Sequence, residues 1–305
     1  MPFPGRVGDY FTALTRIAVP VFFMITEYFY SNIVVRHKEK QQIKKNFFLV
    51  LETNFLFLLW NIVLNILKKD SIVTYIRLTF TGKSLLKFLI LNESPLAGHL
   101  WYLGAILYVL VIVLLVDKLN CRKLFYYLTP ILLIADLVLG KYSLLIFHRE
   151  FSYILVRNFL CVGIPYFCIG NLIREKHCSE KWNKKVLRIL IIVFAITSLA
   201  ERFVLVNEGL NATRDHYIST TLLSVCLFIY ALKSNWSNER LAVIGREYST
   251  WLYVIHPIFI TIFSMIVDKF GIKTFYRCVA PIVVYCATII FLIVLQKIKT
   301  AIKSK

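Results

Sequence analysis

The chain has 305 residues, of which 58% are hydrophobic, and its formal net charge is +19. A water-soluble domain cannot bury this much apolar surface, so the composition excludes an ordinary soluble enzyme and predicts an all-α, polytopic membrane helix bundle. The basic residues stand in short loops between apolar stretches, where the positive-inside rule accounts for them, so we expect no nucleic-acid partner. We expect a single integral membrane domain over residues 1–305, with the lipid bilayer as its surroundings.

Nine stretches are apolar enough to be candidate transmembrane helices. In chain order they are Ala13–Val34, Phe47–Leu67, His99–Val116, Leu124–Leu139, Leu155–Ile173, Val186–Val204, Ile218–Leu232, Ser249–Val267 and Ala280–Leu295. The fourth and the seventh are short. Lys83–Asn92, which precedes the third, is too short to span a bilayer and has an apolar face, which predicts an interfacial helix or a re-entrant segment.

The distribution of lysine and arginine predicts the orientation of the chain. Alternate loops on one side hold more of these residues than the loops on the other side, although the loop 68–87 is an exception. By the positive-inside rule the richer side is cytoplasmic. We therefore expect a multi-pass protein of the cell membrane with its N-terminus outside and its C-terminus in the cytoplasm. The expected cytoplasmic segments are Arg36–Lys45, Lys118–Lys123, Arg174–Lys185, Lys233–Arg246 and Lys297–Lys305.

Arg16 and Arg157 lie within predicted spans, where a charge facing lipid is costly. Arg16 precedes Pro20, and Arg157 is followed by the polar Asn158. Either arginine could reach the membrane interface instead, but two guanidinium groups facing one cavity would attract a pyrophosphate or a developing oxyanion. We therefore predict Arg16, Arg157 and Asn158 as substrate-binding residues. Asp136 also lies inside a span, and we expect it to pair with an intramembrane arginine.

Two histidines are candidate general bases. His99 stands at the start of a span beside Trp101, and His256 precedes Pro257 within another. A histidine titrates near neutrality and could take the proton of an acceptor hydroxyl. The alternatives are a place in the interfacial aromatic belt for His99 and a hydrogen bond to backbone freed by the proline for His256. The seven cysteines form no C-x-x-C pair, so we predict no metal site.

Four separate patches resemble the acyltransferase 3 family, integral membrane enzymes that acylate sugars and related acceptors. They are RIAVPVFFMI from Arg16, GHLWYLG over Gly98–Gly104, RNFLCVGIPYFCIG over Arg157–Gly170, and GREYSTWLYVIHP over Gly245–Pro257. The second and third patches resemble the branch that includes the membrane part of vancomycin-resistance serine racemases. The family fold has ten helices with both ends inside. Our nine spans correspond to that fold without its first helix.

The resemblance implies a membrane acyltransferase that moves an acyl group, commonly acetyl from acetyl-CoA, onto a hydroxyl of a glycan or another envelope component. Acetyl-CoA is then a donor substrate, and no bound cofactor is implied. The family's principal histidine lies on the first helix, for which these residues show no counterpart. We therefore expect weak activity or none, and an apolar groove open to lipid, a partner helix or a second copy of the chain. The alternative is a transporter or membrane sensor for a small polar solute such as an amino acid.

Glu27 departs from the pattern of the family. It stands where the family usually has a glycine, which permits two helices to approach closely. The substitution predicts altered packing or a local ion pair at this position.

Overall fold

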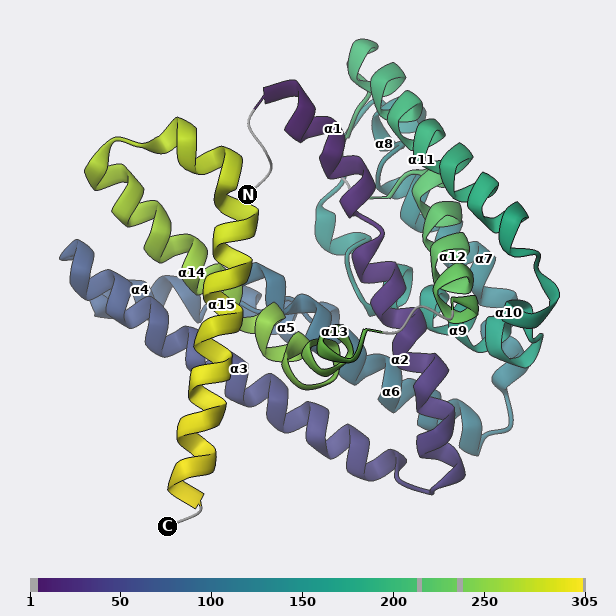
Figure 1. Ribbon diagram of the computed structural model, residues 1–305, viewed down its shortest axis with the longest axis horizontal. Coiled ribbons are helices and arrows are strands. Elements are labelled where there is room, and N and C mark those ends of the chain that lie inside the picture. Colours follow the sequence, from purple (N-terminus) through teal and green to yellow (C-terminus); the bar gives the residue numbers. More distant parts are fainter. Residues whose placement is uncertain (1–4, 213–215, 235–237, 304–305) are drawn as a thin grey trace. The chain divides into compact units, whose positions relative to one another are not determined.

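The computed structural model describes residues 5–212, 216–234 and 238–303, and within these ranges every regular element is a helix (Figure 1). The longer helices are α2 (Ala18–Val35), α3 (Glu39–Lys68), α6 (Trp101–Lys118), α7 (Arg122–Leu139), α11 (Lys184–Asn207), α12 (Ile218–Lys233), α14 (Ser249–Phe270) and α15 (Lys273–Lys303). The shorter ones are α1 (Gly5–Thr15), α4 (Ile72–Thr79), α5 (Gly82–Leu91), α8 (Ser143–Phe147), α9 (Ile164–Glu175), α10 (Cys178–Lys181) and α13 (Glu239–Val243). Short 3₁₀ turns lie at Gly98–Leu100 and Tyr153–Leu155, and π-helical turns lie at Phe159–Gly163 and Ile244–Tyr248.

Six helical stretches within the described residues are long and apolar enough to cross a membrane. They are Tyr10–Val35, Glu39–Lys68, Gly98–Lys118, Lys184–Asn207, Leu241–Phe270 and Thr274–Ile302. The predicted all-α, polytopic membrane bundle is therefore confirmed.

The other three predicted spans are also helical but less regular. The fourth corresponds to α7, which carries three charged residues, Arg122, Lys123 and Asp136. The fifth is broken into a 3₁₀ turn, a π-helical turn and α9, and the seventh corresponds to α12, which has 16 residues. The total of nine spans stays a prediction. The predicted short segment Lys83–Asn92 forms the ten-residue helix α5, which ends where Asn92 adopts a left-handed conformation with φ of 53°.

The chain divides into two compact units, residues 13–234 and residues 1–12 with 235–305. In the smaller unit α14 packs against α15, and Val267 meets Tyr276 and Ala280 in a small core. The ring centroids of Phe259 and Phe291 lie 5.5 Å apart between these two helices. The predicted basic tail 297–305 continues α15 as far as residue 303, and residues 304 and 305 lie outside the described residues.

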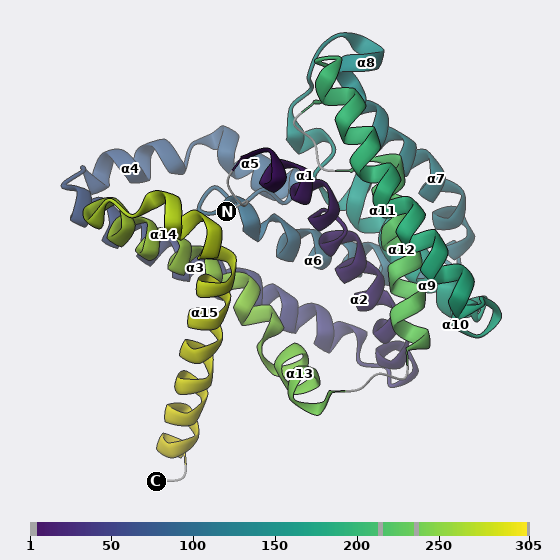
Figure 2. The same ribbon diagram turned by 45° about the horizontal axis from the view of Figure 1, so that its top comes forward.

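The larger unit is built around α2, which packs against α9 and α12, as Figures 1 and 2 show. The backbones of α2 and α9 approach closely at Gly170, because a Cβ atom there would lie only 2.6 Å from the carbonyl oxygen of Met24. The contact therefore requires glycine at position 170. The small residue that lets these helices meet comes from α9, while α2 carries the larger Glu27 one turn further along.

Candidate active site

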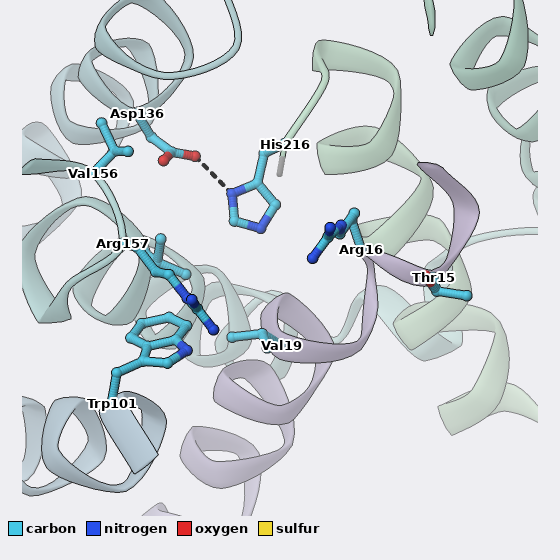
Figure 3. A pocket seen from close by; sticks show the side chains of 9 residues that line it. Thr15, Arg16, Val19, Trp101, Asp136, Val156, Arg157 and His216 are labelled. Atoms are coloured by element: carbon cyan, nitrogen blue, oxygen red, sulfur yellow. Dashed lines mark hydrogen bonds and ion pairs between the residues drawn. The ribbon is translucent and has the colours of Figure 1, made fainter. Parts of the chain in front are cut away.

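The larger unit contains a cavity of about 130 Å³ beside the N-terminal end of α2 (Figure 3). Its lining side chains come from the end of α1, the start of α2 and the residues between them, from α6 and α7, and from the segments that precede α9 and α12: Thr15, Arg16, Val19, Trp101, Asp136, Val156, Arg157, Val162 and His216. The structure thus brings Arg16 and Arg157, both predicted from the sequence as substrate-binding residues, to one cavity. Two positive groups and one carboxylate face this space.

Arg157 is held by an aromatic ring. Its guanidinium carbon lies 5.0 Å from the ring centroid of Trp101, which is itself buried at the start of α6. Such a cation–π contact contributes about 0.5–2 kcal/mol, depending on how far the cation is desolvated. The Nε atom of Arg157 is buried and has no hydrogen-bond partner among the described residues. Trp101 therefore fixes the plane of the guanidinium without neutralising its charge.

A buried histidine–aspartate pair forms the opposite wall. The Nδ1 atom of His216 lies 2.8 Å from Oδ2 of Asp136, and these residues are only 8% and 5% exposed. The other ring nitrogen of His216 points toward the two arginines (Figure 3). A carboxylate on Nδ1 fixes the orientation of an imidazole and stabilises its protonated form, which suits Nε2 to act as a general base. Asp136 pairs with His216 in the structure, and the expected pairing of Asp136 with an arginine stays a prediction.

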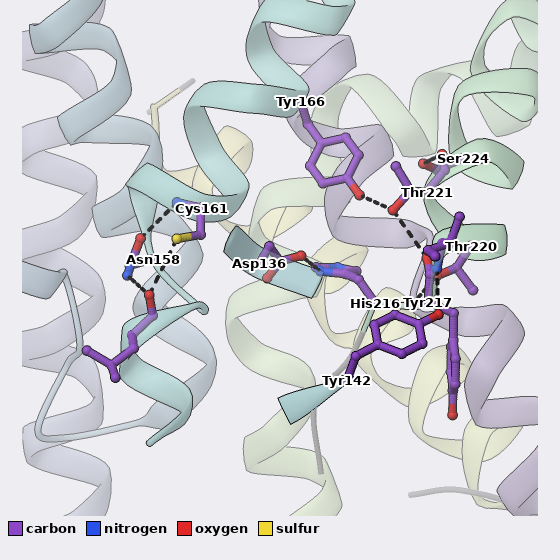
Figure 4. Close-up of polar contacts among 12 residues, drawn as sticks. Asp136, Tyr142, Asn158, Cys161, Tyr166, His216, Tyr217, Thr220, Thr221 and Ser224 are labelled. Carbon is purple, nitrogen blue, oxygen red and sulfur yellow. Dashed lines mark hydrogen bonds and ion pairs between the residues drawn. The ribbon is translucent and has the colours of Figure 1, made fainter. Parts of the chain in front are cut away.

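The neighbours of His216 are also fixed (Figure 4). The ring of Tyr166 on α9 stands edge-on to the imidazole, with centroids 5.9 Å apart, and its hydroxyl lies 3.0 Å from Oγ1 of Thr221. At the start of α12 the backbone N–H of Tyr217 donates to Oγ1 of Thr220 over 2.8 Å. The residue that follows His216 is thus tied into the first turn of α12.

A buried lysine ties the preceding residues to α7. The Nζ atom of Lys141, just beyond α7, donates to the carbonyl oxygen of Ala212 over 2.6 Å. The same atom lies 4.7 Å from the ring centroid of Tyr217. Because Asp136 lies on α7 itself, that helix and its end contact the chain on both sides of residues 213–215. These contacts hold His216 against its carboxylate.

Asn158 does not line the cavity but supports the residue beside it. Its Oδ1 accepts a hydrogen bond from the backbone N–H of Leu160 over 2.9 Å. It also accepts one from the backbone N–H of Cys161 over 3.0 Å (Figure 4). Its Nδ2 donates to the carbonyl oxygens of Ile154 and Leu155 over 2.8 and 3.0 Å. The side chain therefore caps the π-helical turn before α9. A role in substrate binding stays a prediction, whereas the contacts in the structure position the backbone next to Arg157.

The two predicted catalytic histidines are not among the residues that line this cavity. His99 lies in the 3₁₀ turn before α6, and its ring packs edge-on against Phe57 with centroids 4.8 Å apart. His256 belongs to the smaller unit, where Nδ1 lies 3.1 Å from the carbonyl oxygen of Leu252 on α14. Their catalytic roles stay predictions. Within the described residues, no group of three or more His, Cys, Asp or Glu residues could hold a metal ion.

The sequence reasoning missed His216, although one signal pointed to it. An aspartate inside an apolar helix needs a partner, and the chain has only six histidines besides its arginines and lysines. A search for the partner of Asp136 among those histidines would have included His216. Its setting among charged residues in the sequence RDHY makes it resemble an ordinary loop residue instead.

Comparisons with known proteins agree with this architecture. The family model described as an acyltransferase domain matches residues 1–295, which takes in both compact units. A serine/alanine racemase of Enterococcus gallinarum is 24% identical over 271 residues, covering 82% of this chain but only 36% of the length of that relative. No solved structure matches the chain. Because the family match extends over nearly all of the sequence, the chain belongs to the acyltransferase 3 family of multi-pass membrane proteins.

Proposed function

We propose that this chain is a membrane acyltransferase that moves an acyl group, with acetyl as the simplest case, from acyl-CoA to a hydroxyl of a glycan or another envelope component. One observation carries the proposal: a buried histidine–aspartate pair, 2.8 Å apart, faces the same cavity as two arginines. Acyl transfer to a hydroxyl needs a base for the hydroxyl proton and positive groups for the oxyanion. The cavity contains both.

The step assigns a role to each of these side chains. Nε2 of His216 takes the proton of the acceptor hydroxyl while its oxygen attacks the thioester carbonyl carbon. A C–O bond forms, and the negative charge that develops on the carbonyl oxygen is stabilised by the guanidinium groups of Arg16 and Arg157. When the C–S bond breaks, the imidazolium returns the proton to the departing CoA thiolate. Asp136 stays ionised throughout and stabilises the imidazolium.

The size of the cavity limits what it holds. Its volume of about 130 Å³ is well below the roughly 300–1,000 Å³ of pockets that enclose drug-sized ligands. The cavity therefore accommodates the thioester end of the donor together with the acceptor hydroxyl. We propose that the nucleotide part of acyl-CoA binds outside it, where the basic segment Arg174–Lys185 offers partners for phosphate groups. This placement requires the cytoplasmic C-terminus and outside N-terminus predicted from the loop charges, which reporter fusions would test.

Transfer of labelled acetyl groups tests the proposal. Membranes that contain the chain are incubated with acetyl-labelled acetyl-CoA and envelope saccharides. We expect label in a product from which mild alkali releases it, because esters are cleaved under conditions that leave amides intact. Membranes without the chain serve as the control. Equal labelling of both membranes, or label that resists alkali, would contradict transfer to a hydroxyl.

A second candidate is transport or sensing of a small amino acid. The cavity offers guanidinium groups for a carboxylate and Asp136 for an ammonium group, and the matched relative is named a serine/alanine racemase. Proteoliposomes that contain the purified chain would take up labelled serine or alanine without any acyl-CoA. Uptake without acetyl transfer would favour this candidate over the acyltransferase.

A further inference from the structure

A second polar site lies further along α2, away from the cavity that holds the arginines. Glu27 follows the first residue of α2 by nine positions, or about 14 Å along the helix axis at 1.5 Å per residue. It is only 1% exposed, and its Oε2 atom has no hydrogen-bond partner among the described residues. An ionised carboxylate without a partner is among the most costly groups to bury. Some ligand that compensates the charge is therefore expected at this position.

The space around Glu27 is very small. Glu27 lines a cavity of about 10 Å³ together with side chains of α6, α7 and α9: Val113, Arg122, Phe125, Tyr126, Phe167, Cys168 and Asn171. A cavity needs about 10–15 Å³ to hold one water molecule. The site therefore admits at most a single water, which excludes an organic ligand or a hydrated metal ion.

The charged neighbours disfavour a metal cation. Arg122, which lines the cavity, binds Asp117 through two hydrogen bonds of 2.8 and 3.0 Å, so its main partner is not Glu27. Arg174 and Glu175 from α9 also act electrostatically on Glu27. Helices α3 and α12 pack against α2 as well, but none of their described side chains lines this cavity. Because the Arg122 charge is shared with Asp117 and the cavity of about 10 Å³ has no room for a hydrated cation, a proton is the simplest compensating ligand.

A chain of hydrogen bonds connects the cavity with the surface. Tyr126 and Asn171 both line the cavity, and Nδ2 of Asn171 donates to the Tyr126 hydroxyl over 2.6 Å. That hydroxyl donates to Oε2 of Glu175 over 2.9 Å, and Nδ2 of Asn171 lies 3.1 Å from Oε1 of the same residue. Glu175 is exposed at the end of α9. Tyr126 thus lies between a buried carboxyl and an exposed one.

We propose that Glu27 is a proton-binding site in the helix bundle and exchanges its proton with the surface at Glu175 through the hydroxyl of Tyr126. When Glu27 takes up a proton, Glu175 first accepts a proton from bulk water. The Tyr126 hydroxyl, which donates to Glu175 in the structure, then turns, gives its proton to the Glu27 carboxylate directly or through one water, and its oxygen takes the proton held by Glu175. Asn171 orients the tyrosine hydroxyl. Ionisable groups inside membrane bundles commonly form such proton relays. The proposal does not depend on the acyltransferase activity or on His216.

Infrared difference spectroscopy of the purified chain tests the proposal. At neutral pH we expect a protonated carboxyl band that disappears in Glu27→Gln and persists in Glu208→Gln, a matched change at an exposed glutamate. In heavy water the band shifts as the proton exchanges, and Tyr126→Phe should slow this shift at least tenfold. If Glu27→Gln does not fold, ¹³C-labelled glutamate in the unsubstituted chain should shift the same band.

Three results would overturn the proposal. The first is a band unchanged by Glu27→Gln, or unmoved by the glutamate label. The second is a Glu27 that is ionised at neutral pH. If its carboxylate bands also change when sodium replaces choline in the buffer, the ligand is a bound sodium ion and not a proton. The third is an exchange rate that Tyr126→Phe leaves unchanged, which would remove the proposed path. None of these readouts uses acyl-CoA, so loss of the proton site and loss of the acyltransferase activity can be told apart.

Discussion

Replacing His216 with asparagine separates the two roles of this side chain. The amide Nδ2 of asparagine lies near the position of the imidazole Nδ1, so the variant keeps a donor for Oδ2 of Asp136, which is 2.8 Å from Nδ1 in the structure. It removes the ring nitrogen that faces the two arginines. A positioned general base typically contributes about 10²–10⁴-fold to a rate. At about 1.4 kcal/mol per tenfold, we expect the activation barrier to rise by about 3–5 kcal/mol, seen as a lower kcat with KM nearly unchanged.

Stability distinguishes this effect from simple disruption of the fold. His216→Ala takes the imidazole away from a carboxylate that is only 5% exposed, and breaking a buried pair by removing one partner costs about 3–5 kcal/mol. His216→Asn keeps a hydrogen-bond donor and should lose far less. Thermal unfolding in detergent should therefore give a Tm for His216→Asn close to that of the unsubstituted chain, and a clearly lower Tm for His216→Ala.

The assay is transfer of labelled acetyl groups, with the control His148→Asn. His148 is exposed, lies outside both the cavity lining and Arg174–Lys185, and has a φ of 53°, which asparagine tolerates well. The control should keep full activity. A double variant with Asp136→Asn should be about as slow as His216→Asn alone, because residues that act as one unit are not additive. Full activity of His216→Asn would refute the reasoning, and loss of activity in His99→Asn or His256→Asn would then identify the base.

Two further variants test the arginine cavity and the helix packing. Arg157→Lys keeps the charge but loses the planar group that stacks 5.0 Å from the ring centroid of Trp101. We expect KM for the donor to rise about tenfold with little change in Tm. An unchanged KM would contradict a role in binding. Gly170→Ala places a Cβ atom 2.6 Å from the carbonyl oxygen of Met24. Because this contact is too short, we expect the free energy of unfolding to fall by about 1–3 kcal/mol, measured as a lower Tm. Gly82→Ala, which meets no atom within 4 Å, should leave Tm unchanged and serves as the control.

The sequence predicts the class of fold well because membrane insertion depends on local composition. Long apolar stretches such as Phe47–Leu67 must be helical in a bilayer, since no water is present to satisfy the backbone groups. The same reasoning is weaker where a segment is buried among other helices. Leu155–Ile173 looks like one continuous span, but Asn158 caps a π-helical turn within it and α9 begins only at Ile164. Hydropathy does not register such breaks, because they depend on individual hydrogen bonds.

The candidate site could be predicted only in part. The cost of a charge in a membrane singled out Arg16 and Arg157, and both line one cavity; their role in substrate binding stays a prediction. The same cost singled out Asp136 but did not point to His216, because that contact depends on how α7 lies against the segment before α12. His216 is 80 residues from Asp136 in the sequence. Long-range pairings of this kind come from the tertiary arrangement and leave no local pattern.

Asn158 offers the clearest distinction between supporting a site and binding a substrate. It is 2% exposed, and its two side-chain polar atoms make four hydrogen bonds to the backbone of residues 154–161. Asn158→Leu removes all four, and loss of an N-cap alone typically costs about 0.5–2 kcal/mol. We expect a lower Tm together with a lower kcat, because the turn that holds Arg157 would no longer be fixed.

Asn158→Asp provides the decisive comparison. An aspartate keeps the oxygen that accepts hydrogen bonds from Leu160 and Cys161 but has no donor for the carbonyl oxygens of Ile154 and Leu155. If Asn158 acts by capping, aspartate should restore part of the Tm and of the activity that leucine loses, because it keeps the two cap hydrogen bonds although its second oxygen faces two carbonyl oxygens. If Asn158 instead contacts an anionic substrate, a carboxylate should repel that substrate. KM would then rise well above that of the unsubstituted chain while Tm recovers, and this result would return Asn158 to the substrate-binding role predicted from the sequence.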